Sequence, residues 1–175
     1  TPWRNHYHRL HLHTNKGRSN LPYKKFATNI PRYPCRQDVV DYLSDYQKEF
    51  NIQPVFNTEA LWIKKEPGHW ITKTNNESIR SKYVIIATGA FGKPKPVSFK
   101  GMETFPGKIL HSAEYKTGKD FKNQDVLIAG FGNSACEIAI DLYEHGAEPA
   151  MTVRSPVNVV PRDIFGIPVL ELSLL

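Results

Sequence analysis

The sequence has 175 residues, of which 40% are hydrophobic and 23% are charged, a composition typical of a globular domain. No stretch approaches the ~18 consecutive apolar residues of a membrane span, and the first residues show no apolar signal-peptide core. The net charge of +6 comes from residues scattered over loops and strand ends, which favours a solvated basic surface over a nucleic-acid site. The chain does not begin with Met, so we expect it to be an internal piece of a longer protein.

The two cysteines, Cys35 and Cys136, stand about a hundred residues apart, a spacing that gives neither a CxxC redox pair nor a zinc site. We interpret them as free thiols and expect a cytoplasmic protein. Four histidines alternate along the N-terminal segment, but no carboxylate or cysteine accompanies them at ligand spacing, so no metal site is predicted. These histidines are His6, His8, His11 and His13.

The first regular element is predicted at residues 36–50, after an aperiodic segment at residues 1–34. Its apolar residues recur at helical spacing and therefore share one face. An acidic residue in the first turn and a lysine in the last complement the helix dipole. The apolar residues are Val39, Leu43, Tyr46 and Phe50.

Strands are predicted next in the chain. Two alternating runs, residues 59–66 and 69–74, flank a Pro-Gly turn signal and indicate a β-hairpin. After a polar loop, residues 82–87 form a continuous apolar run. Such a run is typical of a strand buried on both faces of a parallel sheet.

A proline-spaced linker at residues 92–96 then marks a predicted domain boundary. Beyond it, a buried strand at 126–129, a helix at 133–144 and a strand at 150–153 are expected to form a βαβ unit. The helix is expected to turn one apolar face toward the strands. That face consists of Ala135, Ile138, Ala139 and Leu142.

Residues 130–135 form a GxGxxA loop between this strand and this helix, which is the context that makes the motif informative. The first glycine permits a tight turn, the second lets a pyrophosphate approach the backbone, and the alanine keeps helix and strand close. Amides of the first helical turn then bind the anion. A glycine turn without a ligand is the alternative. The predicted contacts are Gly130, Gly132, Asn133, Ser134 and Ala135.

The end of the second strand distinguishes NADPH from NADH. An NAD site usually places Asp or Glu there to bind the ribose hydroxyls. Here the strand ends in Val153 and Arg154, without a carboxylate. A guanidinium can pair bidentately with a phosphate, so Arg154 favours NADPH; an ordinary surface arginine is the alternative.

Residues 105–115 match the pattern FxGxxxHxxxY, and they stand before the GxGxxA loop in the chain. This pattern identifies flavin-containing monooxygenases and N-hydroxylating relatives, and the chain resembles that family. Baeyer–Villiger monooxygenases have Trp at the last position, so the Tyr here argues against the ketone-oxidising branch. Further segments, among them residues 10–13, resemble the plant indole-pyruvate monooxygenases and their bacterial relatives. The motif residues are Phe105, Gly107, His111 and Tyr115.

The resemblance implies an α/β fold with two Rossmann-like dinucleotide-binding domains, both incomplete in this chain. Residues 1–92 would be part of an FAD-binding domain without its first GxGxxG unit. Residues 93–122 would be a linker, in which His111 couples the two domains, and residues 123–175 the start of an NADPH-binding domain. The implied FAD contacts are Trp3, Ala60, Thr88 and Gly89.

The implied function is that of an FAD- and NADPH-dependent flavoprotein monooxygenase. NADPH reduces FAD, and a C4a-hydroperoxyflavin formed with O2 transfers one oxygen atom to a small organic substrate. Asn15 resembles an asparagine that many flavin monooxygenases keep beside the flavin and nicotinamide, where its amide can donate a hydrogen bond. A turn-forming asparagine is the alternative. The expected partners are a small-molecule substrate and O2, without nucleic acid or a membrane span.

Two other classes remain open. A pyridine-nucleotide disulfide reductase shares tandem dinucleotide folds but needs a redox-active cysteine pair, for which this sequence has no CxxC. A non-catalytic dinucleotide-binding remnant would share the motifs without the chemistry. Whichever class is right, we expect the 175-residue chain to be inactive alone, because it does not contain the first flavin loop.

Overall fold

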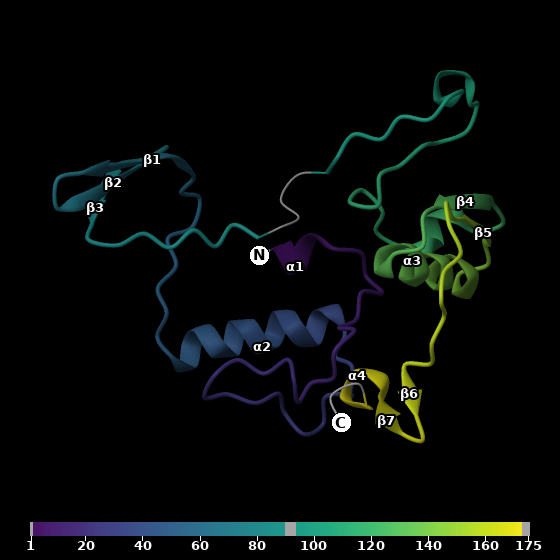
Figure 1. Ribbon diagram of the computed structural model, residues 1–175, viewed down its shortest axis with the longest axis horizontal. Coiled ribbons are helices and arrows are strands. Elements are labelled where there is room, and N and C mark those ends of the chain that lie inside the picture. Colours follow the sequence, from purple (N-terminus) through teal and green to yellow (C-terminus); the bar gives the residue numbers. More distant parts are fainter. Residues whose placement is uncertain (1, 90–93, 173–175) are drawn as a thin grey trace. The chain divides into compact units, whose positions relative to one another are not determined.

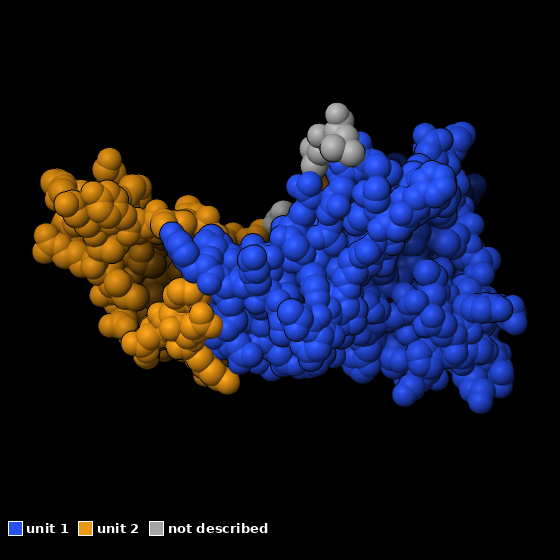
Figure 2. Space-filling view, turned by 90° about the horizontal axis from the view of Figure 1, so that it is seen from below, with its two compact units in different colours: residues 1–46, 97–175 blue, residues 47–96 orange. Residues whose placement is uncertain are grey.

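The computed structural model describes residues 2–89 and 94–172 and combines helices with strands, which places the chain in the α/β class (Figure 1). The chain divides into two compact units, residues 1–46 with 97–175 and residues 47–96 (Figure 2). The boundary predicted at residues 92 and 93 lies outside the described residues. The division into a partial flavin domain, a linker and a second domain therefore stays a prediction.

The helix predicted at residues 36–50 is confirmed as α2 (Arg36–Glu49). Its start is capped by Asp38, whose Oδ2 accepts a hydrogen bond from Cys35 N at 2.8 Å. The packing centre of the helix is Tyr42, which stacks on Phe26 with 4.0 Å between ring centres. The short helix α1 (Pro2–Asn5) adds Trp3 to this cluster. The helix thus buries a face centred on Tyr42, while Phe50, just past its end, is 39% exposed.

The predicted βαβ unit is present in the first unit. Strand β4 (Asp125–Ala129) and strand β5 (Glu148–Thr152) pair in parallel, and helix α3 (Asn133–Glu144) connects them (Figure 1). The bounds of α3 are those predicted, and β5 begins two residues earlier than expected. Ile138 and Leu142 of α3 are buried against the inward side chains of β4.

The expectation that β4 is a buried strand is wrong for the described residues. Its side chains alternate between partial burial and exposure, and Leu127 is 71% exposed. The reason is that α3 covers one face of the two-stranded sheet, and no other described element covers the second face. Burial of a strand depends on neighbours that its own residues do not encode.

The main core of the first unit joins distant segments of the chain. Tyr7 from the N-terminal segment and Tyr115 pack with Ile138, Leu142 and Ala147, and Leu142 is fully buried. The two tyrosine rings meet edge to face with 6.3 Å between their centres. The N-terminal segment is therefore part of the same packed body as the βαβ unit.

Five further short elements lie among the described residues of the first unit. The 3-10 helix η1 (Met102–Thr104) lies just before the motif at residues 105–115. The 3-10 helix η2 (Gly118–Phe121) lies between that motif and β4. After β5 come an antiparallel pair, β6 (Asp163–Ile164) and β7 (Ile167–Pro168), and the helical turn α4 (Val169–Leu172).

The second unit contains the predicted hairpin and a third strand. Strands β1 (Ala60–Glu66) and β2 (His69–Thr74) are antiparallel, and β3 (Ser78–Ser81) pairs with β2. The predicted strand at residues 82–87 is not observed, because no described strand pairs with it. Its side chains are largely exposed, with Ile85 at 89% and Ile86 at 74%.

Among the described residues, no helix is long and apolar enough to cross a membrane.

Candidate functional site

The two glycines of the loop in the βαβ unit are explained by different structural requirements. Gly130 has a φ of +124°, which L side chains rarely adopt, and a Cβ there would meet nothing within 4 Å. Its amide donates to Thr152 O at 2.9 Å and so extends the β4–β5 pairing. Gly130 is therefore required by the backbone turn.

Gly132 is not required by the fold. It has a φ of −83°, accessible to any residue, and a Cβ placed on it would meet nothing within 4 Å. It caps the N-terminus of α3 and, as a glycine, offers the helix amides no side-chain acceptor. The open space lies directly at the positive end of the helix dipole, where an anion is stabilised.

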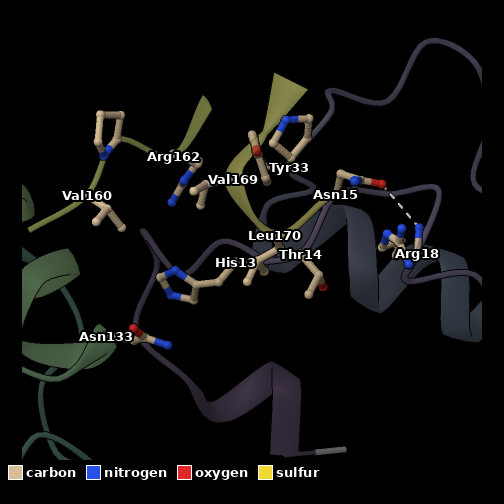
Figure 3. A pocket seen from close by; sticks show the side chains of 12 residues that line it. His13, Thr14, Asn15, Arg18, Tyr33, Asn133, Val160, Arg162, Val169 and Leu170 are labelled. Atoms are coloured by element: carbon tan, nitrogen blue, oxygen red, sulfur yellow. Dashed lines mark hydrogen bonds between the residues drawn. The ribbon is translucent and has the colours of Figure 1, made fainter. Parts of the chain in front are cut away.

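A pocket of about 310 Å³ lies next to this loop within the first unit (Figure 3). Asn133, the first residue of α3, lines it together with residues of the N-terminal segment and of the segment that follows β5. Among the described residues, its charged or titratable lining residues are His13, Arg18, Arg162 and Tyr33, and none of them is a carboxylate.

Asn15 lies in the pocket wall, as a cofactor-facing residue would, but its amide is already engaged within the chain. Its Nδ2 donates to Glu171 Oε1, and its Oδ1 accepts from Arg18 N at 3.2 Å (Figure 3). Arg18 Nε also lies 3.7 Å from Glu171 Oε1. This arrangement is compatible with both the turn-forming and the cofactor-facing interpretation of Asn15.

Glu137 is a buried carboxylate beside the pocket, 4% exposed. Arg9 Nη1 donates to its Oε2 at 2.8 Å, while His11 Nδ1 lies 3.6 Å and Arg162 Nη2 3.8 Å from its carboxylate oxygens. Arg9 also binds Glu144 of α3 through two hydrogen bonds of 2.8 and 2.9 Å. The N-terminal segment is thus tied to α3 by charge as well as by packing.

Asp141, one turn further along α3, binds the linker motif. Its Oδ2 accepts hydrogen bonds from Tyr115 Oη at 2.6 Å and from Gly118 N at 2.7 Å. Burial, followed by the bond to this carboxylate, raises the pKa of Tyr115 well above its ordinary value. A Cβ on Gly118 would stand 2.3 Å from Asp141 O, so a side chain is excluded there.

The other motif residues are held less tightly. Phe105 is 56% exposed, and its ring covers Gly107, where a Cβ would come within 2.6 Å of it. His111 Nδ1 accepts a hydrogen bond from Ala113 N at 3.1 Å, which stabilises a local turn. The role of His111 in coupling two domains stays a prediction.

The structure brings the predicted residues of the glycine loop together, and the predicted FAD contacts belong to both units. Gly130, Gly132, Asn133, Ser134 and Ala135 form one loop and helix start, and Arg154 follows β5 on the surface. Trp3 packs in the first unit, whereas Ala60, Thr88 and Gly89 lie exposed in the second. The FAD contacts of these four residues stay predictions.

The buried acids Glu137 and Asp141 were missed from the sequence. Each immediately precedes an apolar core residue of α3, Ile138 or Leu142, so the helical period places both acids at the edge of the buried face. An acid at that position signals a buried partner. The partners themselves, Arg9 and Tyr115, are too distant in sequence to identify in this way.

A parallel β4–α3–β5 unit with an open glycine at the helix start is the architecture of the α/β dinucleotide-binding class. The comparison with known families agrees. The model of the pyridine nucleotide-disulphide oxidoreductases matches residues 14–162, and the chain belongs to that family.

Individual relatives lie among the flavin monooxygenases. The chain is 37% identical over 170 residues to the probable indole-3-pyruvate monooxygenase YUCCA4 of Arabidopsis thaliana, an alignment that covers 96% of this chain and 41% of the relative. A flavin monooxygenase mutant from Stenotrophomonas maltophilia superposes with a TM-score of 0.83 at 26% identity, covering 93% of this chain and 49% of that one. The resemblance drawn from the motif at residues 105–115 is thereby confirmed.

A third comparison shows the fold alone. A cyclohexanone monooxygenase mutant from Rhodococcus sp. Phi1, solved with NADP+ bound, superposes with a TM-score of 0.77 at 22% identity over 91% of this chain and 33% of that one. The chain spans about two-fifths of the length of the curated relative described above, with 41% of it covered.

Proposed function

We propose that the protein containing this chain is a flavin-dependent monooxygenase, which uses FAD, NADPH and O2 to insert one oxygen atom into a small organic substrate. The structural observation behind the dinucleotide part is the open space above Gly132. The oxygenase part is supported by the likeness to an indole-3-pyruvate monooxygenase over 96% of the chain. Indole-3-pyruvate is therefore the first substrate to test.

The glycine loop has the features that NADPH requires. Nothing in the described chain fills the space beside Gly132, and its φ of −83° does not demand glycine. A pyrophosphate that approaches the backbone does demand it. Asn133, Ser134 and Ala135 begin the helix whose amides would hold the anion. Arg154, at the end of β5, would bind the 2′-phosphate of NADPH.

The remaining contacts are proposed from the family resemblance. Two Rossmann-like domains would each hold one dinucleotide, with Trp3, Ala60, Thr88 and Gly89 near the FAD. FAD, when bound, would accept electrons from NADPH and activate O2. The chain itself would bind and orient the cofactors and exclude water, and Asn15 would donate a hydrogen bond near the flavin.

A disulfide reductase of the same family is the competing function. It needs two cysteines within reach of the flavin, and the two free cysteines of this chain, Cys35 and Cys136, lack CxxC spacing. The oxygenase is favoured by the likeness to flavin monooxygenases at 37% and 26% identity. A cytoplasmic location remains a prediction from the sequence.

The proposal is tested on the full-length protein. Anaerobic addition of NADPH should bleach the flavin absorbance, and O2 with indole-3-pyruvate should then give one product molecule per NADPH. Reduction of a disulfide by NADPH without oxygen uptake would favour the reductase instead. A protein that retains no flavin, and does not oxidise NADPH, would be the non-catalytic remnant.

A further inference from the structure

Arg162 occupies an unusual place in the pocket wall. It comes from the segment after β5, outside the glycine loop, and its guanidinium carbon lies 4.5 Å from the centre of the Tyr33 ring. Its Nη2 lies 3.8 Å from Glu137 Oε1. A cation over an aromatic face and beside a carboxylate is held in position from two sides.

Both contacts leave the hydrogen-bond donors of Arg162 unused. The distance of 3.8 Å to Glu137 is too long for a hydrogen bond, and Glu137 already accepts a bond of 2.8 Å from Arg9. No hydrogen bond of the Arg162 side chain is found within residues 2–89 and 94–172. The side chain is 45% exposed and lines the pocket.

His13 presents a second unused group in the same pocket. Its Nε2 is buried and has no hydrogen-bond partner among the described residues. Burial, together with the nearby Arg162 and His11, lowers the pKa of His13 although Glu137 opposes the shift. A buried polar atom without a partner is energetically unfavourable, so a ligand that bonds to it is favoured.

The pocket continues to the start of α3. Asn133, which follows Gly132, forms part of its wall, and Figure 3 shows His13 lying between Asn133 and Arg162. Within the part of the chain that the structure describes, its lining includes two arginines and no carboxylate. The ligand chemistry that suits this wall is an anion with several acceptor oxygens.

We infer that Arg162, held by Tyr33 and Glu137, is a further binding residue for the pyrophosphate of NADPH, on the pocket wall that it shares with His13 and Asn133. This inference rests on the proposed function, because it takes NADPH as the dinucleotide of the glycine loop. Arg154 and Arg162 then have different tasks. Arg154 binds the 2′-phosphate, and Arg162 binds the pyrophosphate.

The two tasks can be separated by binding measurements on the full-length protein with its flavin. The probes are NADP+ and adenosine 2′-monophosphate, which has the 2′-phosphate but no pyrophosphate. Arg162→Ala should raise the Kd of NADP+ about tenfold or more, as expected for the loss of a hydrogen bond between charged groups, and leave the Kd of adenosine 2′-monophosphate unchanged. Arg154→Ala should raise both. Arg80→Ala, an exposed arginine of β3, is the matched control and should change neither.

Each outcome has one meaning. An unchanged Kd of NADP+ in Arg162→Ala overturns the inference and leaves the proposed function intact. Equal weakening of both probes by Arg162→Ala also overturns it, because the effect would not be confined to the pyrophosphate. Failure of the unmodified protein to bind NADP+ would instead overturn the proposed function. The flavin spectrum and the Tm of each variant report whether it is folded.

Discussion

Asp141 shows how one buried carboxylate fixes several segments. It is 3% exposed, and it accepts hydrogen bonds from Tyr115 and Gly118, both in the segment before β4. A buried charge is tolerated only when such donors compensate for lost hydration. The tyrosine that ends the motif at residues 105–115 therefore has a structural role: its hydroxyl binds the segment before β4 to α3.

Loss of that hydroxyl should reduce stability. We expect Tyr115→Phe to lower the free energy of unfolding by about 1–3 kcal/mol, because a buried acceptor loses a partner. Urea unfolding of the full-length protein measures this. The control is Tyr143→Phe. Tyr143 lies on α3, as Asp141 does, and is 72% exposed, so loss of its hydroxyl should change the free energy of unfolding by less than about 0.5 kcal/mol. Similar losses in the two variants would contradict the role assigned to Asp141.

Arg154 carries the predicted preference for NADPH. It stands where an NAD site would present a carboxylate, and it is exposed at the end of β5. Arg154→Ala in the full-length enzyme should raise the KM for NADPH about tenfold or more, the cost of a charged hydrogen bond, and barely change the KM for NADH. Steady-state kinetics with both cofactors check this, and equal effects would refute it.

At the scale of elements, the sequence correctly predicted the helices and the hairpin whose formation depends on residues close together in the chain. The helix α3 was predicted with its observed bounds, because a glycine loop precedes it and its apolar residues keep one period. The hairpin β1–β2 was predicted from alternation around a Pro-Gly turn. The glycine loop, the central part of the candidate site, was likewise visible in the sequence.

Elements that depend on distant partners were not predictable. The apolar run at residues 82–87 was expected to be a strand, but strand formation needs a pairing neighbour, and no described segment supplies one. Likewise, Arg9 and Arg162 approach Glu137 only in the folded chain. Neither the pocket nor its unused donors could be derived from local pattern.

The glycine loop gives a paired prediction. Gly130→Ala places a side chain at a φ of +124° and should cost about 1–3 kcal/mol of stability. Gly132→Ala should leave stability within about 1 kcal/mol, because its Cβ meets nothing within 4 Å, yet weaken NADP+ binding about tenfold or more by blocking the pyrophosphate. Thermal unfolding and titration calorimetry separate the two effects. Normal NADP+ affinity in Gly132→Ala would show that the pyrophosphate does not bind in the open space beside Gly132.

At the scale of the whole molecule, the described chain leaves large apolar surfaces uncovered. Leu127 of β4 is 71% exposed, and Ile85 and Ile86 are 89% and 74% exposed. Exposed apolar strands and extended segments are sites of association between chains. These exposed apolar side chains are candidate sites of association between copies of the 175-residue chain.

We therefore expect the 175-residue chain, purified by itself, to be aggregation-prone, to bind FAD weakly at best and to oxidise no NADPH. The full-length protein should be yellow and active, because both dinucleotide folds would then be complete. Size-exclusion chromatography, the absorbance spectrum and NADPH oxidation measure the difference. A yellow, monodisperse preparation of residues 1–175 that oxidises NADPH would overturn this expectation.

The salt bridge between Arg9 and Glu137 also constrains the order in which the chain folds during its synthesis. The two residues are 128 positions apart in the chain, so on the ribosome Arg9 emerges long before its partner is synthesised. At ordinary rates of translation this delay is on the order of ten seconds. Helix α3 is synthesised close in time to β4 and β5, on which it packs, whereas the N-terminal segment can dock only after α3 has been made. Docking of that segment is therefore a late, high-contact-order event in co-translational folding.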